Sequence, residues 1–254
     1  MADLPRTRYA KNGDVHIAYQ VAGGGDLDIL LIDTWVHHVE AVWDFPDFAR
    51  FLRRLSSLGK LIHFDRRGTG LSDSVPLDQL PDFQTQVADA VAVLEAAGAD
   101  RAAVIGLNDG TIVASMLAAA EPERCPALIL FTFAASHSLA AGMPMESIDE
   151  VIAVIEASAL SNDSGVELLA PSRVGDETFD RHLARLQRFS VRPGAYGHFY
   201  ARRWRLTSPT CCRPSGCRRW WQWDLGPGTH RGALAAAAAG RSPADQAGPY
   251  ATVA

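Results

Sequence analysis

Short apolar stretches recur along the first 205 residues, separated by polar or glycine-rich segments. From Val15 to Val21 apolar residues alternate with polar or small ones, which is the pattern of a strand with one buried face. Compact apolar runs without alternation are typical of strands that are buried on both faces. Such runs predict further strands at residues 28–33, 61–65, 102–106 and 127–133.

Amphipathic stretches lie between these runs. Apolar residues at helical spacing predict helices over about residues 45–58 and 83–97, and an alanine-rich helix begins at about Thr111. Strands that alternate with helices imply a mostly parallel sheet with helices on both faces. The sequence therefore predicts an α/β fold.

Residues 137–204 depart from this alternation. Two stretches, 145–159 and 179–189, have helical patterns, and no convincing strand lies between them. We interpret the region as a helical insertion over the carboxyl edge of the sheet, where a lid would lie. Plain helical packing without a lid function is the alternative.

Composition and charge narrow the functional classes. With 254 residues, 48% of them hydrophobic and 21% charged, the chain matches a soluble globular protein. The formal net charge of −5 gives no reason to expect binding to nucleic acid or to an anionic membrane. No apolar run approaches the roughly 20 residues of a membrane span, and residues 1–14 lack the apolar core of a signal peptide. We expect a cytoplasmic protein without cofactor or metal, and the oligomeric state is left open.

The last 49 residues, 206–254, differ in composition from the rest. They hold four large aliphatic residues, five prolines and six glycines, and their net charge is +3 against −8 for residues 1–205. A segment with so few core-forming side chains cannot readily offset the entropy cost of becoming ordered. We therefore divide the chain into a folded domain, residues 1–205, and a tail that we expect to be disordered.

A turn bracketed by glycines is the strongest candidate for chemistry. Gly106 and Gly110 follow a predicted strand and precede a predicted helix, which is the context of the nucleophile elbow G-x-S-x-G. Such a strained turn raises one side chain above the sheet, and here that residue is Asn108. The backbone N–H of Asp109 would point into the site at the start of the helix, where it could hold a developing oxyanion.

Two earlier segments strengthen this interpretation. Asp33–Thr34–Trp35 follows a predicted strand, at the place where esterase-like folds supply a second oxyanion N–H, here that of Trp35. Residues 65–72 have the form D-x-R-G-x-G-x-S, a sharp turn with a structural role near the site. The residues that shape it or tie it down are Asp65, Arg67, Gly68 and Gly70.

In this order the motifs resemble the α/β-hydrolase family. More narrowly, they are similar to its actinobacterial branch, whose hydrolase-like domain is often joined to an adenylate or guanylate cyclase or to a transcription-regulator domain. The resemblance covers about residues 7–205 and rests on RYAKNGDVHIAYQVAG, DFARFLRRLSSLGKLIHFDRRGTGLSD, and the elbow with the PERCPALILFTFAA that follows it. It implies an α/β-hydrolase fold and cleavage of ester or similar acyl bonds by a Ser–His–acid mechanism.

The chain departs from this family at the catalytic positions. Asn108 stands where the family has Ser, or sometimes Asp or Cys, and an amide is a poor nucleophile. Asp109 is one residue from the apex and is a poor substitute. The family's catalytic acid and His would lie beyond residue 205, where nothing resembles them. We therefore expect little or no ester turnover; if Asn108→Ser alone were active, His198 would be the first base to test.

Two alternatives to an impaired hydrolase stay open. One is a non-catalytic module that senses an apolar small molecule in a pocket beneath the helical insertion. The other is a truncated product without a function of its own. GC-rich codons for residues 210–221 permit the string DVLPSIRVPTVV in a shifted frame, which resembles the family's lead-in to its next core strand. We hypothesise a frameshift near residue 205.

Other polar clusters have simpler explanations. His37 and His38 have no further ligands at a spacing that suits a metal, so we interpret them as surface or lid-contact histidines. Residues 211–230 contain three cysteines, and three tryptophans beside arginines, but no strand or helix pattern surrounds them. They predict neither a zinc site nor a nucleic-acid surface.

Overall fold

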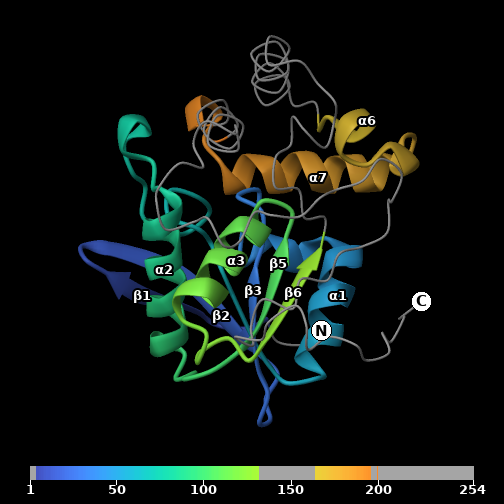
Figure 1. Ribbon diagram of the computed structural model, residues 1–254. Coiled ribbons are helices and arrows are strands. Elements are labelled where there is room, and N and C mark those ends of the chain that lie inside the picture. The colour runs from blue at the N-terminus through green and yellow to red at the C-terminus, as the bar shows by residue number, and fades with distance from the viewer. Residues whose placement is uncertain (1–3, 132–163, 196–198, 200–254) are drawn as a thin grey trace, which may run out of the picture.

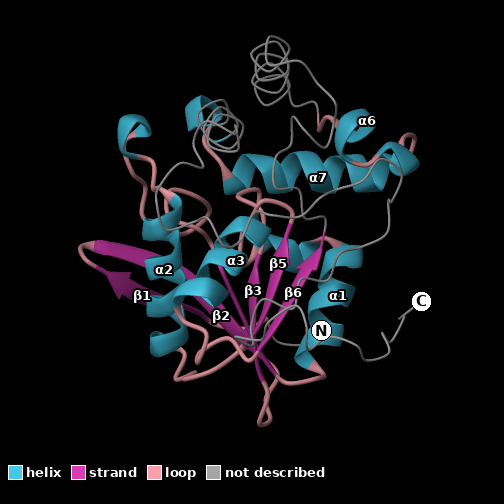
Figure 2. Cartoon of the chain, in the orientation of Figure 1, coloured by secondary structure: helices cyan, strands magenta, loops and turns pink. Residues whose placement is uncertain are grey.

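The computed structural model describes residues 4–131, 164–195 and 199 of the chain. Its centre is a six-stranded sheet in the order β1-β2-β4-β3-β5-β6 (Figures 1 and 2). The strands are β1 (Thr7–Asn12), β2 (Val15–Ala22), β3 (Asp28–Ile32), β4 (Lys60–Phe64), β5 (Ala103–Leu107) and β6 (Ala127–Phe131). β4, β3, β5 and β6 are parallel, and β1 and β2 form an antiparallel hairpin that joins the sheet along β4. The predicted mostly parallel sheet is confirmed.

Helices cover both faces of this sheet (Figure 2). α2 (Phe83–Ala96) and α3 (Gly110–Ala120) lie on one face and α1 (Pro46–Ser56) lies on the other. Two further helices, α6 (Val166–Leu169) and α7 (Glu177–Ser190), lie above the carboxyl ends of the strands. Neighbouring residues of β3 show why both faces need apolar side chains: Leu30 packs into the core with α2 and α3, whereas Leu31 packs with α1. Both leucines are fully buried. The absence of alternation in the 28–33 run thus follows from burial on two sides.

The helix α7 lies across the carboxyl ends of the parallel strands (Figure 1). Asp176 caps its start by accepting the Phe179 N–H at 3.0 Å. At its other end, the Ser190 C=O accepts the Gly70 N–H at 2.7 Å. This bond attaches the helix predicted at 179–189 to the glycine-rich turn after β4.

Several sequence predictions concern residues that lie outside the described part. These are the helix at 145–159, the residue His198, the cysteine- and tryptophan-rich segment, and the tail 206–254. Within the described residues, no helix combines the length and the apolar character needed to cross a membrane.

Candidate functional site

The turn between β5 and α3 raises Asn108 above the sheet. Asn108 has φ +50°, and among the described residues it is the one non-glycine with a positive φ. An L-residue in this region is strained, so the surrounding structure must hold it there. The Asn108 N–H donates to the Phe131 C=O at 3.0 Å, and the Asn108 C=O accepts the Thr111 hydroxyl at 2.5 Å. Its side chain is exposed, as the elbow interpretation predicts for this position.

The two glycines of the turn allow α3 to approach the sheet. A Cβ on Gly106 would lie 2.8 Å from the Cβ of Ala114, and a Cβ on Gly110 would lie 2.1 Å from the Ile32 carbonyl oxygen. Both positions lie at a contact between α3 and a strand. The G-x-x-x-G spacing is therefore required by backbone packing as well as by the turn itself.

Asp109 is tied to the turn after β4 by a buried ion pair. Its carboxylate binds the Arg66 guanidinium, and both side chains are less than 10% exposed. Arg66 also donates to the Gln86 side-chain oxygen at 2.9 Å and to the Asp33 C=O at 3.3 Å. One guanidinium therefore braces the elbow, the loop after β3 and the helix α2. The sequence interpretation singled out Arg67 and missed this role of Arg66.

Trp35 lies in the loop after β3, beneath the segment that follows α7. Its ring stacks on Phe199 with centroids 5.4 Å apart and an angle of 8° between the planes. Val191 and Ala195 pack against it, and the Trp35 side chain is 2% exposed. Arg66 links this loop to Asp109, but the convergence of the Trp35 and Asp109 N–H groups on one point stays a prediction.

Asp65 fixes the turn after β4 from inside. Its two carboxylate oxygens accept the Val39 N–H and the Leu71 N–H, each at 2.8 Å. Gly70 has φ +51°, and a Cβ there would lie 2.2 Å from Asp65 Oδ2. Burial raises the pKa of Asp65 to about 7, although the nearby His37 and the two N–H donors act to lower it.

Arg67 and Gly68 attach the same turn to its surroundings. Arg67 binds Asp89 of α2 through two hydrogen bonds of 2.6 and 3.0 Å, so it ties the turn to that helix. The hydrogen bond to Asp89 raises the pKa of Arg67. Gly68 has φ +84° and lies against Val75 and Phe199.

His37 and His38 are buried, so their interpretation as surface residues is wrong. The Nδ1 atom of His37 lies 3.2 Å from Oδ2 of Asp33, and its Nε2 atom lies 3.2 Å from Nδ1 of His63. The side chains of His37 and His63 are almost wholly buried. The chain Asp33–His37–His63 therefore joins the ends of β3 and β4.

His38 accepts the N–H groups of Glu40 and Ala41, and its ring lies 5.8 Å from that of Phe189 in α7. The lid-contact interpretation thus fits His38 alone.

Burial and charge act in opposite directions on the His37–His63 pair. Burial acts to lower the pKa of His37, but the hydrogen bond to Asp33 and the charges of Asp33 and Asp65 together outweigh it, so that the net shift is upward. Burial, together with the charge of His37, holds the pKa of His63 well below its ordinary value. The native state therefore keeps His63 neutral.

We expect His63 to make the protein less stable in mild acid. Below about pH 6.5 the unfolded chain binds a proton at this residue that the native state does not bind. The stabilising contribution is present above pH 6.5 and is lost as the pH falls, by up to about 1.4 kcal/mol per pH unit. The raised pKa values of His37 and Asp65 act in the opposite direction, so the contribution of His63 is the difference between wild type and His63→Asn, whose amide can still form a hydrogen bond with His37. In denaturant unfolding between pH 7.5 and 5, the variant should lose less stability than wild type, or gain more, as the pH falls. Equal slopes for the two proteins would contradict this account.

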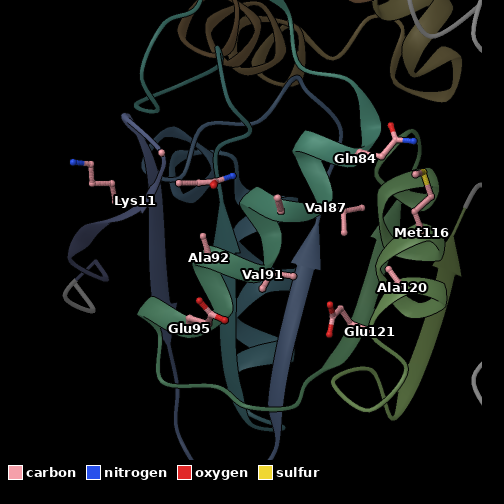
Figure 3. A pocket seen from close by; sticks show the side chains of 12 residues that line it. Lys11, Gln84, Val87, Val91, Ala92, Glu95, Met116, Ala120 and Glu121 are labelled. Atoms are coloured by element: carbon pink, nitrogen blue, oxygen red, sulfur yellow. The ribbon is translucent and has the colours of Figure 1, made fainter.

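A groove of about 560 Å³ lies away from the elbow, between α2, α3 and the β1–β2 turn. Val87, Val91 and Met116 form its apolar floor, and Lys11 and Glu95 lie at its rim (Figure 3). Because it opens on the outer side of α2 and α3, this groove is separate from the site around Asn108. Within the described residues, no group of three or more His, Cys, Asp or Glu side chains is arranged to hold a metal ion.

Comparisons with known proteins bear on the fold. No protein-family model matches the chain. A hydrolase from Pseudomonas aeruginosa is 22% identical, with a TM-score of 0.59, covering 79% of this chain and 74% of that one. The esterase RhEst1 from Rhodococcus sp. ECU1013 is 21% identical, with a TM-score of 0.54, covering 78% and 73%. An α/β hydrolase from Novosphingobium aromaticivorans is 17% identical, with a TM-score of 0.54, covering 73% and 64%. With the parallel sheet, the helices on both faces and the raised turn after β5, these likenesses show that the chain has the α/β-hydrolase fold.

Proposed function

We propose that this protein is a relative of the serine esterases and acyl hydrolases that has lost the ability to turn over esters. The observation that carries the proposal is Asn108 at the apex of the elbow, exposed and held at φ +50°. Acyl transfer at this position requires a group that attacks a carbonyl and then bears the acyl group covalently. The amide nitrogen of Asn108 has no basic lone pair. The turn therefore still exposes a side chain at the nucleophile position, but that side chain cannot attack a carbonyl.

The surroundings of the elbow still suit an oxyanion. The N–H of Asp109 lies at the start of α3, where the helix dipole favours negative charge. Arg66 binds both the Asp109 carboxylate and the Asp33 C=O, which holds the loop of Trp35 beside the elbow. Backbone donors alone can leave a residual acceleration of about 10³–10⁴ over water in enzymes without a triad.

His37 is not available as a general base. Its two ring nitrogens face Asp33 and His63, at 3.2 Å each, and the ring is 1% exposed. A base for acyl transfer must reach the nucleophile through one free nitrogen while an acid orients the other. His37 therefore serves the packing between β3 and β4.

The test is hydrolysis of p-nitrophenyl acetate by the full chain. We expect wild type and Asn108→Ala to give the same low background, because the Asn108 side chain does no chemistry. Asn108→Ser should recover little, since triad members act as a unit and one restored member is not enough. Turnover by wild type at about 1 s⁻¹ or faster, lost in Asn108→Ala, would overturn the proposal.

A second candidate function is binding of an apolar small molecule without turnover. The stack of Trp35 on Phe199 favours it, because this aromatic pair joins the loop after β3 to the segment that follows α7. A ligand that binds only the native state raises the melting temperature. A screen of apolar compounds by thermal shift supports this function if a hit stabilises wild type but not Trp35→Ala, and argues against it if the shifts are equal.

The order of the motifs also leads us to place the chain in the cyclase-linked actinobacterial branch.

A further inference from the structure

Two imidazole rings, those of His37 and His63, are buried together beside the strand β4. Neither side chain is more than 1% exposed, and the rings of Trp43 and Phe48 lie against them. Three of their four ring nitrogens face a polar atom, because His37 contacts both the Asp33 carboxylate and Nδ1 of His63 at 3.2 Å. The fourth, Nε2 of His63, is buried and has no hydrogen-bond partner among the described residues.

The two contacts determine where the protons of the neutral pair lie. An ionised carboxylate only accepts hydrogen bonds, so the proton shared with Asp33 is on Nδ1 of His37. A neutral imidazole has one N–H and one bare nitrogen, so Nε2 of a neutral His37 is an acceptor. The proton between the rings is then on Nδ1 of His63. Nε2 of His63 is therefore a bare acceptor in this state.

One added proton reverses the hydrogen bond between the rings. A charged His37 has an N–H at both nitrogens, so its Nε2 donates to Nδ1 of His63. In this change the incoming proton forms an N–H bond at Nε2 of His63. The N–H bond at Nδ1 of His63 breaks, and its proton forms the new N–H bond at Nε2 of His37. The positive charge ends on His37, although the proton entered at the other ring.

We propose that His37 and His63 form a proton relay, in which a proton taken up at Nε2 of His63 is stored as charge on His37 and changes the tautomer of His63. His63 is the point of entry because both nitrogens of His37 are engaged. The shifts in pKa agree with storage on His37: burial and the charge of His37 lower the pKa of His63, whereas Asp33 and Asp65 raise that of His37 against the effect of burial. The relay depends on neither Asn108 nor ester turnover.

The stored charge is attracted toward the loop after β3. Asp33 and Asp65 come directly after β3 and β4, and the charges of both act on His37. On the side of β2, His63 faces uncharged groups: Gln20 is its partner in the β2–β4 register, and Gln20 Oε1 accepts the Trp43 N–H at 2.8 Å. A charge-assisted hydrogen bond is stronger than a neutral one, so a charged His37 holds Asp33 and its loop more firmly. The other titratable or charged groups around the pair are His38, Glu40 and Arg66.

The first test follows both tautomers in the full chain, by NMR with nitrogen-15-labelled histidine. Ring nitrogen shifts distinguish a protonated nitrogen from a bare one, and a charged ring from a neutral one. As the pH falls from about 9 to about 5, across the ordinary pKa of histidine, His37 should become charged. At the same midpoint the proton of His63 should move from Nδ1 to Nε2. A His63 tautomer that does not change in this range, or a His63 ring that becomes charged before His37 does, overturns the proposal.

The same spectra separate the relay from titration of Asp65. Burial raises the pKa of Asp65 to about 7, so this carboxyl group gains its proton in the same range of pH. A proton on Asp65 leaves the N–H positions of both rings as they are. A pH-dependent change in ring shifts without exchange of the protonated nitrogen in His63 therefore assigns the titration to Asp65 and overturns the relay.

Asp33→Asn tests where the charge is stored. Without this carboxylate, the midpoint for His37 should fall by at least about one pH unit, and the change in the His63 tautomer should move with it. Asp73→Asn is the matched control, because it removes a carboxylate 2.9 Å from the exposed His16 and should leave both buried rings at the wild-type midpoint. An unchanged midpoint in Asp33→Asn, or a His63 tautomer that still changes at the wild-type pH, overturns the proposal. The wild-type titration decides it even if Asp33→Asn does not fold.

Discussion

Replacing Arg66 by methionine should lower the free energy of unfolding by about 3–5 kcal/mol, the usual cost of removing one member of a buried ion pair. The change leaves the Asp109 carboxylate, 4% exposed, without its cationic partner, and removes the N–H donors from Gln86 and the Asp33 C=O. At about 2–4 °C per kcal/mol for a chain of this size, the melting temperature should fall by roughly 10 °C. Urea unfolding followed by circular dichroism measures the loss directly.

The exposed pair between Arg124 and Glu95 provides the matched control. Its atoms lie 3.0 Å apart, but the two side chains are 30% and 58% exposed, so Arg124→Met should cost less than about 1 kcal/mol. Replacing both partners of the buried pair, in Arg66→Met with Asp109→Leu, should recover part of the loss, because no uncompensated charge is then buried. A loss of less than 1 kcal/mol for Arg66→Met would show that Arg66 does not brace the elbow.

We expect Gly110→Ala to be the most damaging change of a single methyl group in the elbow. The added Cβ would lie 2.1 Å from the Ile32 carbonyl oxygen and 2.8 Å from that of Asp33. Both atoms are backbone, so neither can move aside as a side chain can, and α3 must shift away from β3. Overpacking typically costs about 1–3 kcal/mol, and we expect the upper end or more. Thermal unfolding of the purified variant gives the value.

Gly24→Ala is the control for this substitution. Gly24 lies in the loop between β2 and β3, and a Cβ there meets no atom within 4 Å. Its stability should equal that of wild type or exceed it slightly, because alanine restricts the unfolded chain. If both variants unfold at the wild-type temperature, the close contact between α3 and β3 is not as the structure describes it.

The strands buried on both faces could be predicted because their apolar residues lie side by side in the sequence. The run at residues 28–33 contains β3, and the run at 61–65 contains most of β4. The run at 127–133 contains β6, but the expectation of burial on both faces is wrong there, because Ala127, Ile129 and Phe131 are exposed. β1 was missed, because its sequence TRYAKN has Ala10 as its one buried residue. What makes it a strand is pairing with β2 across the two-residue turn at Gly13, where φ is +63°. That information is not in the apolar pattern.

The elbow could be predicted because its glycines and the flanking strand and helix lie within one short segment. The polar contacts that hold it could not, since Arg66 and Asp109 are 43 positions apart, and His37 and His63 are 26 apart. One local signal existed for the second pair. His63 is a polar residue in the middle of the apolar run LIHFD, and such a residue needs a buried partner.

Gly106 and Gly110 are required because a Cβ at these positions would collide with Ala114 and with the backbone of Ile32, respectively. Neither contact involves the side chain of Asn108 at the apex. A substitution at residue 108 can therefore remove a nucleophile without loosening the turn, and stability alone favours keeping both glycines afterwards. In this chain the glycine pair reflects backbone packing, whereas the residue at the apex, Asn108, determines whether a nucleophile is present. Under the proposed function, surveys of genomes that score the spacing alone would count this chain as an esterase, whereas surveys that insist on serine would overlook its scaffold.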